Sequence, residues 1–539
     1  MKHRLVILGA SAGTVFEWYD FYLYGSLASV ITRQFFSGVN ETTGYIFALL
    51  AFASGFAVRP FGAALFGRLG DLWGRKNTFL VTMLLMGVST FAVGLLPAYR
   101  TAGLVAPLAL VGLRLLQGLA IGGEYGGAAV YVAEHAPPGK RGLYGGWIQT
   151  TASLGLILSL LVIMAARRGL GEDTFQAWGW RIPFLVSAGL LGVSLWIRLK
   201  LDESPVFKRM VTEGRAATRP LREALADKAN RRRMLTALFG LHAGQGAIWY
   251  TSQFYGLFFL ERMLKVEGAT ANWLVAGALM IGTPIFVLSG WLSDKVGRKP
   301  VMLAGFLLAV VGAFPLFHEL THAANPALAA AAARTPVIVA SAPKDCSLQF
   351  DPVGQARFDS PCDIAKGALA SAGAPYRNTP LPDGRIAEVR IGATVIPSFA
   401  GKGLTPAELA ARQAAWRAGL STALVRAGYP AKADPKGVNP PLVVAVLAVL
   451  MLSVALTCGP IPATVAEMYP ARVRYTSMSL PFHLGNGWFG GFMPTVAFAL
   501  VAASGDIYAG LWYPVVIGTM SLIISLVFLP ETRHADINA

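Results

Sequence analysis

Several ionisable side chains of this sequence stand inside long apolar segments, where a charge is costly and is a functional candidate by default. Glu17 and Asp20 are three residues apart and Tyr24 follows one turn later, so in a helix all three share one face. Two carboxylates in a low-dielectric cleft raise each other's affinity for protons. The spacing predicts a group that loads and releases a proton; structural pairing with an arginine is the alternative.

Arg59 stands beside Pro60 in the second apolar segment. A guanidinium group binds a carboxylate in bidentate fashion, so Arg59 is a candidate to receive the carboxylate of a substrate. The alternative is an ion pair with Asp20 or Glu17, which would neutralise Arg59 within the protein.

The fourth apolar segment carries Arg114, Gln117 and Glu124. Gln117 and Glu124 are seven residues apart and share a helix face, and the glycines of GGEYGG around Glu124 allow a neighbouring helix to approach closely. We expect Arg114 and Glu124 to serve proton coupling or substrate binding; a packing role is the alternative.

A seventh apolar segment places four polar or aromatic side chains at offsets 0, 3, 7 and 11, which would form one helical stripe: His242, Gln245, Trp249 and Gln253. The polarity of the stripe favours a central cavity, with packing as the alternative. His483 and Asn486 in the eleventh segment are weaker candidates of the same type. The cysteines and histidines show no metal-site spacing, and we expect no metal and no cofactor.

The pattern G-x-L-x-D-x-x-G-R-K occurs twice, at residues 67–76 and 290–299. The positions that could act as a conformational switch are Gly67, Asp71, Gly74 and Arg75 in the first copy and Gly290, Asp294, Gly297 and Arg298 in the second. The glycines permit a tight turn between helices, and the charged residues can make breakable ion pairs with neighbouring helices. A simple positive anchor at the membrane is the alternative, but two copies in register favour a duplicated unit.

The elements that carry these residues follow from composition: 54% of residues are hydrophobic, only 14% are charged, and the mean hydropathy is +0.53. Such a chain is a polytopic membrane protein. The apolar stretches long enough to span a bilayer cover residues 7–32, 44–66, 77–96, 104–132, 143–166, 180–199, 234–260, 271–292, 300–318, 441–466, 476–503 and 507–529. The sequence therefore predicts an all-α membrane protein with twelve transmembrane helices in two six-helix repeats.

The predicted organisation is an N-terminal six-helix bundle (1–200), a basic cytoplasmic linker (201–233) and a second bundle in two parts (234–321 and 441–539). Lys and Arg in the short loops place both termini in the cytoplasm. The net charge of +17 is mostly this bias, and its scatter over loops on both faces argues against nucleic-acid binding. Parallel repeats predict a substrate site near the midplane between the halves.

Residues 322–440 depart from this plan, because they are rich in Ala and Pro and much less hydrophobic. We expect a small extracytoplasmic insertion, with disorder as the alternative. Thr405-Pro406-Ala407-Glu408 predicts the start of a helix that runs to about Arg426, and Val337 to Ala340 and Ile386 to Ile396 have strand-like apolar runs. Cys346 and Cys362 would be able to pair in an oxidising compartment.

The chain resembles a transporter of the major facilitator superfamily, whose signature is the duplicated loop. It is similar, more narrowly, to the metabolite:proton symporter family, which includes carriers of α-ketoglutarate, citrate, shikimate and proline/betaine. The motifs that carry the resemblance are FEWYDFYLYG (16–25), VRPFG (58–62), RLLQGLAIGGEYGG (114–127), EHAPPGKRG (134–142), DESPVF (202–207), EMYPARVR (467–474) and PET (530–532). The resemblance implies the major facilitator fold and transport driven by a proton gradient across a bacterial inner membrane. It also matches Arg114 to an arginine to which proton coupling is ascribed.

The favoured function is proton-coupled symport of a small organic acid by alternating access. The expected partners are the small-molecule substrate, protons and the lipid bilayer; nucleic acid is not expected, and the protein is expected to be a monomer and not an enzyme. Three alternatives stay open: an osmolyte or amino-acid symporter, an exporter of the same superfamily, and a non-transporting receptor that senses through the insertion.

Overall fold

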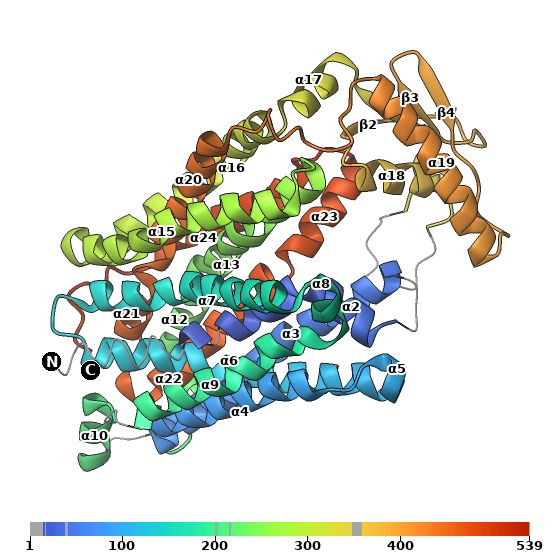
Figure 1. The fold of residues 1–539 in the computed structure, drawn as a ribbon. Helices are drawn as coiled ribbons and strands as arrows, with labels where there is room; N and C mark the ends of the chain where they lie inside the picture. The colour runs from blue at the N-terminus through green and yellow to red at the C-terminus, as the bar shows by residue number, and fades with distance from the viewer. Residues whose placement is uncertain are drawn as a thin grey trace.

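The computed structural model describes residues 14–16, 18–37, 41–199, 203–214, 217–347 and 358–537. Glu17 falls outside these residues, and so does the start of the first predicted span. The long helices run side by side in one elongated bundle, and a sheet-containing segment stands at one end of it (Figure 1).

Residues 14–16 and 18–26 are helical, and the following helices complete what we call the first half (residues 14–199). Its helices are α2 (Ala28–Phe35), α3 (Glu41–Trp73), α4 (Arg75–Leu95), α5 (Tyr99–Ala102), α6 (Val105–His135), α7 (Arg141–Leu170), α8 (Glu172–Thr174), η1 (Phe175–Gly179) and α9 (Arg181–Leu199). Three short helices follow: α10 (Pro205–Thr212), α11 (Pro220–Ala226) and α12 (Lys228–Leu235).

The second half comprises residues 228–324 and 440–537. Its first helical run contains η2 (Thr236–His242), α13 (Ala243–Tyr250), η3 (Thr251–Tyr255), α14 (Gly256–Phe258) and η4 (Phe259–Met263). The remaining helices are α15 (Gly268–Val296), α16 (Arg298–Ala324), α20 (Pro440–Cys458), α21 (Ile461–Met468), η6 (Ala471–Val473), α22 (Arg474–Leu484), η7 (Gly485–Gly490), α23 (Met493–Ser504), η8 (Ala509–Leu511) and α24 (Trp512–Phe528).

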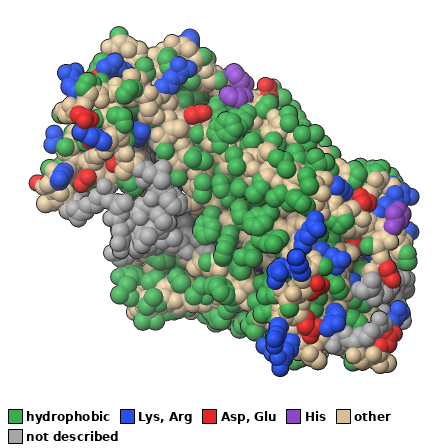
Figure 2. Space-filling view, turned by 180° about the vertical axis from the view of Figure 1, so that it is seen from behind, with side chains coloured by type: hydrophobic (Ala, Val, Ile, Leu, Met, Phe, Trp, Pro, Cys, Tyr) green, Lys and Arg blue, Asp and Glu red, His purple; other side chains and the backbone are tan. Residues whose placement is uncertain are grey.

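Eight helices of the described chain are long and apolar enough to cross a membrane, and a pair bent by 63°, Glu172–Gly179 with Arg181–Ile197, makes a ninth candidate. The bundle also exposes large apolar side chains such as Leu108, Trp273 and Met280. Figure 2 shows hydrophobic side chains spread across the middle of one face, with Lys and Arg gathered toward its two ends. This distribution suits a protein whose middle faces lipid.

Glycine sets the geometry at two points that matter for function. Gly74 and Gly297 separate α3 from α4 and α15 from α16, with φ angles of 101° and 110° that other residues rarely adopt. Within the first half, α3 and α6 touch backbone to backbone: a Cβ atom on Gly62 would lie 2.1 Å from the Leu119 carbonyl oxygen. This contact fixes α3, and with it Arg59, against α6.

The residues between α16 and α20 form what we call the sheet segment (residues 325–439). Its strands are β1 (Val337–Ser341), β2 (Tyr376–Pro380), β3 (Glu388–Ile391) and β4 (Thr394–Pro397), in the order β2-β1-β3-β4. β1 pairs with β2 in parallel and with β3 antiparallel, and β3 pairs with β4 antiparallel. Its helices are α17 (Pro326–Arg334), η5 (Pro343–Asp345), α18 (Pro361–Ser371) and α19 (Pro406–Arg426).

The sheet segment is joined to the second half by hydrogen bonds at the end of α23. The Tyr376 backbone N–H donates to the Gly505 carbonyl oxygen at 2.8 Å, and Asn378 Nδ2 donates to the Ser504 carbonyl oxygen at 2.8 Å. Cys346 and Cys362 are disulfide-bonded within the segment. The α19 start has the expected capping box of Thr405 with Glu408, whereas the sequence reading did not foresee β2.

Candidate functional site

The first half holds a buried chain of hydrogen bonds that joins a carboxylate to a guanidinium. Arg114 Nη1 donates to Gln117 Oε1 at 2.9 Å, and Gln117 Nε2 donates to Thr90 Oγ1 at 2.6 Å. The Thr90 hydroxyl in turn donates to Asp20 Oδ2 at 2.7 Å. All four side chains are at least nine-tenths buried. A change in the charge of Asp20 would therefore alter the hydrogen bonds of Thr90 and Gln117, and through them the hydrogen bond of Arg114.

Aromatic rings hold the two arginines of this site. Arg114 Cζ lies 3.6 Å from the centroid of the Tyr24 ring, and Arg59 Cζ lies 4.1 Å from that of Phe56. Arg59 also interacts with the Tyr250 hydroxyl on α13, in the other half. The structure thus gathers five of the predicted residues, namely Asp20, Tyr24, Arg59, Arg114 and Gln117. Glu17 and the side chain of Glu124 lie outside the described residues.

A cavity of about 20 Å³ lies between Asp20, Arg59 and Arg114. This volume accommodates a single water molecule and no organic acid. Beside the cavity the two halves meet through aromatic rings: the centroids of Trp18 and Trp249 are 5.1 Å apart, and those of Phe21 and Phe254 are 5.9 Å apart. These ring contacts close the bundle beside the cavity.

The four residues of the predicted stripe in the second half are all buried, and they contact three different sets of neighbours. His242 and Gln245 lie near Asn486, whose Nδ2 donates to Gln245 Oε1 at 2.8 Å. Trp249 faces Trp18, and Gln253 Nε2 donates to Met451 Sδ at 3.2 Å. Gln245 and Trp249 lie in the α-helix α13, whereas Gln253 lies in the π-helical turn η3, where the larger number of residues per turn departs from the α-helical spacing of the stripe.

Each signature loop binds the start of a helix in the opposite half. Asp71 accepts the backbone N–H of Thr476 at 3.0 Å and pairs with Arg75 Nη1 at 2.8 Å. Asp294 accepts the backbone N–H groups of Gly142 at 2.9 Å and Leu143 at 2.8 Å, and it also pairs with Arg298. Carboxylates at helix N-termini are stabilising, so both loops hold the halves together at what we call the signature-loop end.

Two buried glutamates complete this contact reciprocally. Glu134 of the first half pairs with Arg474 of the second at 2.8 Å. Glu467 of the second half pairs with Arg141 of the first at 3.5 Å and with Arg298 at 3.2 Å. Both glutamate side chains are fully buried. The pair of Glu467 with Arg298 lies within the second half, whereas the pairs of Glu134 with Arg474 and of Glu467 with Arg141 join the two halves and require them to be in contact.

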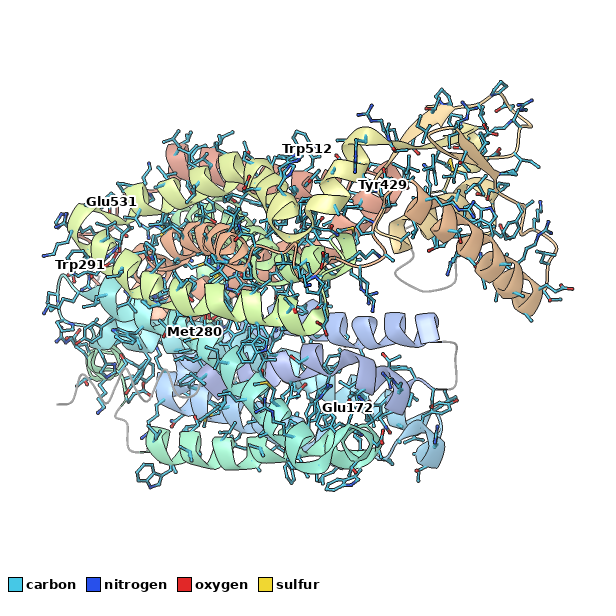
Figure 3. All side chains as sticks on the ribbon, turned by 45° about the horizontal axis from the view of Figure 1, so that its top comes forward. Glu172, Met280, Trp291, Tyr429, Trp512 and Glu531 are labelled. Carbon is cyan, nitrogen blue, oxygen red and sulfur yellow. A yellow bond between two sulfur atoms is a disulfide. The ribbon has the colours of Figure 1, made fainter. Side chains whose placement is uncertain are left out.

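Two further acidic residues cap the helices that follow the signature loops. Glu203 accepts the backbone N–H of Arg75 at 3.1 Å, and Glu531 accepts that of Arg298 at 2.9 Å. Figure 3 labels Glu531 at the signature-loop end, far from Tyr429 in the sheet segment. Burial opposes ionisation of Glu531, but hydrogen bonds from four backbone N–H groups outweigh burial and hold its pKa below the usual value; the donors are Arg298, Lys299, Thr532 and Arg533.

The sequence reading missed these four glutamates as functional residues. The signal was present: Glu134 and Arg141 are seven residues apart after one long apolar segment, and Glu467 and Arg474 have the same spacing after its counterpart in the second half. Only a comparison of the two repeats beyond the signature loop would have found it.

Comparisons with known proteins agree with this geometry. A family model described as "Sugar (and other) transporter" matches residues 5–246. The chain is 35% identical to the α-ketoglutarate permease of Escherichia coli over 322 residues, which are 59% of this chain and 72% of that protein. It is 36% identical to the shikimate transporter of the same organism, covering 59% of this chain and 73% of that protein.

Other relatives extend the picture. The chain is 35% identical to the proline/betaine transporter of Salmonella typhimurium, and the match covers 59% of this chain and 64% of that protein. Among solved structures, the proton:xylose symporter XylE superposes with a TM-score of 0.62 at 15% identity, covering 100% of this chain and 98% of XylE. This likeness establishes the major facilitator fold. The chain therefore belongs to the major facilitator superfamily, and within it to the family of metabolite transporters that includes the α-ketoglutarate permease and the shikimate transporter.

Proposed function

We propose that this protein is a proton-coupled symporter that carries a small organic acid across the bacterial inner membrane by alternating access. It acts as a monomer with twelve transmembrane helices in two halves, and the signature-loop end faces the cytoplasm. The observation that carries the proposal is the pair of reciprocal buried ion pairs, Glu134 with Arg474 and Glu467 with Arg141. A carrier that works by alternating access must close this end and later open it. Ion pairs between the two halves form when the end closes and separate when it opens, so they suit such a carrier.

The central site supplies the chemistry for coupling. Arg59 offers a guanidinium to a carboxylate of the substrate. Asp20 is the proton carrier, because its protonation removes the negative acceptor at the end of the Thr90 and Gln117 chain and so weakens the restraint on Arg114. The 20 Å³ cavity is too small for an organic acid, so loading requires the two halves to part at the aromatic contact of Trp18 and Trp249.

Uptake into reconstituted vesicles tests this function. Radiolabelled α-ketoglutarate, citrate, shikimate, proline and betaine are compared with and without an inward proton gradient. We expect uptake of an acid that depends on the gradient, that is lost in Arg59→Ala and that persists in Arg100→Ala, which removes an exposed arginine of α5. Folded wild-type protein that takes up none of the acids would refute the proposal.

A zwitterion such as proline or betaine is the second candidate substrate. The aromatic contact between the halves favours it, because rings such as Trp18, Tyr22, Trp249 and Phe254 offer faces to a quaternary ammonium group. The same uptake series decides between the two: betaine uptake above that of every acid, lost in Trp249→Ala, would identify the zwitterion carrier.

A further inference from the structure

Three buried side chains at the centre of the described structure have polar atoms without a hydrogen-bond partner. They are both ring nitrogens of His483, Nε2 of His242 and the hydroxyl of Ser479. None of the three residues is more than 1% exposed. Buried polar groups in native proteins are nearly always satisfied, so a cluster of exceptions calls for a missing partner. We call these residues the orphan cluster.

The orphan cluster lies where the two halves meet. Ser479 and His483 are one turn apart on one face of α22, and the Ser479 hydroxyl is packed against Gly126 of α6 in the first half. His483 interacts electrostatically with Arg59 of α3 and with His242 of η2. These are the charged and titratable groups that face His483 in the described structure. The cluster thus extends the site of Arg59 into the second half.

The groups of the orphan cluster and the neighbouring Arg59 can all bind an anion. A serine hydroxyl and a protonated imidazole both donate hydrogen bonds, and Arg59 is a cation. A neutral imidazole buried beside a cation has little reason to take up a proton, because a second positive charge would be repelled and desolvated. An anion bound between Arg59 and His483 reverses this balance, since it accepts from the hydroxyl and pairs with both cations.

We propose that His483 is a substrate ligand that accepts a proton when a carboxylate of the transported acid binds between it and Arg59, with Ser479 donating a further hydrogen bond. This inference rests on the proposed function and deepens it. The proton comes from the extracytoplasmic solvent and forms an N–H bond on the imidazole, which donates to a carboxylate oxygen. The O–H bond of a hydronium ion breaks as this N–H bond forms, and no other covalent bond changes.

This arrangement couples the two ions by linkage. If anion binding increases proton affinity at His483, then protonation of His483 increases anion affinity by the same factor. The bound carboxylate also bridges α3 of the first half and α22 of the second. The substrate anion and the proton on His483 are therefore held between two cations that belong to different halves. Asp20 remains a separate proton site within the first half.

The experiment counts protons taken up on binding. Purified full-length protein is titrated with α-ketoglutarate and with shikimate in weakly buffered solution containing a pH indicator, and bound acid is measured by equilibrium dialysis. Compared with wild type, His483→Gln is expected to bind about tenfold or more weakly, as loss of a hydrogen bond to a charged group implies, and to take up about one proton fewer per bound acid. His318→Gln, which changes an exposed histidine whose ring contacts that of Tyr508, is the matched control and should behave as wild type.

Ser479→Ala gives a second, independent readout. It should weaken binding while leaving the number of protons unchanged, because the hydroxyl donates a hydrogen bond and carries no titratable proton in this range. Wild-type proton uptake in His483→Gln, or wild-type affinity in Ser479→Ala, would overturn the assignment. If wild type binds neither acid, nor citrate as a third ligand in the same titration, the proposed function fails and this inference fails with it. Binding with unchanged proton uptake in the variant refutes the role of His483 alone.

Discussion

Glu134 and Glu467 show how two side chains can define a conformational state. Each is fully buried and each pairs with an arginine of the opposite half. An intact buried ion pair adds little net stability, but the removal of one partner is costly because it leaves the other charge desolvated. These glutamates therefore contribute less to the fold than to the preference for the closed signature-loop end.

Replacement of Glu134 by Gln should open the signature-loop end. The buried Arg474 loses its counter-charge, which costs about 3–5 kcal/mol in the closed state and nothing in a state where Arg474 meets water. The measurement is labelling of a cysteine introduced at Ser293, a buried position at this contact. Background is low because the third cysteine, Cys458, is buried and the other two are disulfide-bonded.

The control for that experiment is Glu172→Gln, since Glu172 makes an exposed ion pair with Arg167. Exposed pairs contribute at most about 1 kcal/mol, so labelling should equal that of the parent protein. Equal labelling in Glu134→Gln as well would show that the buried pair does not bias the two states.

Asp20→Asn should uncouple transport from the proton gradient. Asparagine is neutral at all relevant pH values and is close in shape to protonated aspartic acid, so the Thr90 hydroxyl keeps a neighbour but the proton site is gone. We expect the variant to exchange labelled for unlabelled substrate but to lose accumulation against a gradient. Asp173→Asn, at an exposed residue of α8, should behave as wild type. Gradient-driven accumulation by Asp20→Asn would remove Asp20 from the mechanism.

At the scale of elements, the contact of α3 with α6 determines where Arg59 lies. A Cβ atom on Gly118 would meet the Gly55 carbonyl oxygen at 2.2 Å, whereas Gly112 on the same helix has open space around it. Gly118→Ala should therefore destabilise the protein by about 1–3 kcal/mol through overpacking. Gly112→Ala should stabilise it by up to about 1 kcal/mol through helix propensity. Thermal unfolding of both purified variants in detergent measures the difference, and equal midpoints would contradict the close contact.

The cap of α16 predicts a dependence on pH. The pKa of Glu531 is lowered from 4.5, so its stabilising effect is present above pH 4.5 and is lost as the pH falls through the lowered value. Glu531→Gln should then lower the unfolding temperature more at pH 7 than at an acidic pH below 4.5, where the carboxyl group of the wild type takes up a proton. Glu319→Gln, at an exposed position, is the control. A variant equally destabilised at both pH values would show that the charge of Glu531 is not the cause.

The sequence predicted the helical membrane class and the signature loops because both depend on local pattern. Apolar length sets the class, and Gly74 and Gly297 mark turns that need a positive φ angle. It also predicted α19, whose start is defined by neighbouring residues alone. The hydrogen-bond partners of the signature loops could not be predicted. Asp71 accepts from Thr476, which is 405 residues away, and no spacing within a single sequence indicates such a pair.

Two other differences have physical causes of the same kind. The stripe from His242 to Gln253 assumed α-helical periodicity throughout, but Gln253 lies in the π-helical turn η3, where its Nε2 donates to Met451 Sδ. The strand β2 reads Tyr-Arg-Asn-Thr-Pro and is exposed after Tyr376, so it lacks the apolar alternation by which a strand is recognised. It is held by pairing with β1 and by its bonds to the end of α23, which are tertiary effects.

At the scale of the whole molecule, one backbone contact limits how far the halves close. Gly290 on α15 and Gly142 on α7 face each other across the two halves, and a Cβ atom on Gly290 would lie 2.2 Å from the Gly142 carbonyl oxygen. The backbone atoms at the start of α7 cannot move away from such a Cβ atom unless the whole helix moves. The Asp294 bonds to Gly142 and Leu143 depend on this approach.

Gly290→Ala should therefore hold the halves apart at the signature-loop end without unfolding either of them. We expect cysteine labelling at Ser293 to rise, uptake to fall and the unfolding temperature to stay near that of wild type, because packing within each half is untouched. Gly277→Ala on the same helix, where the new methyl group meets Val444 at an ordinary 3.6 Å, should transport normally. Normal uptake by Gly290→Ala would mean that the transport cycle does not pass through this closed contact, and the alternating-access role of the signature loops would have to be abandoned.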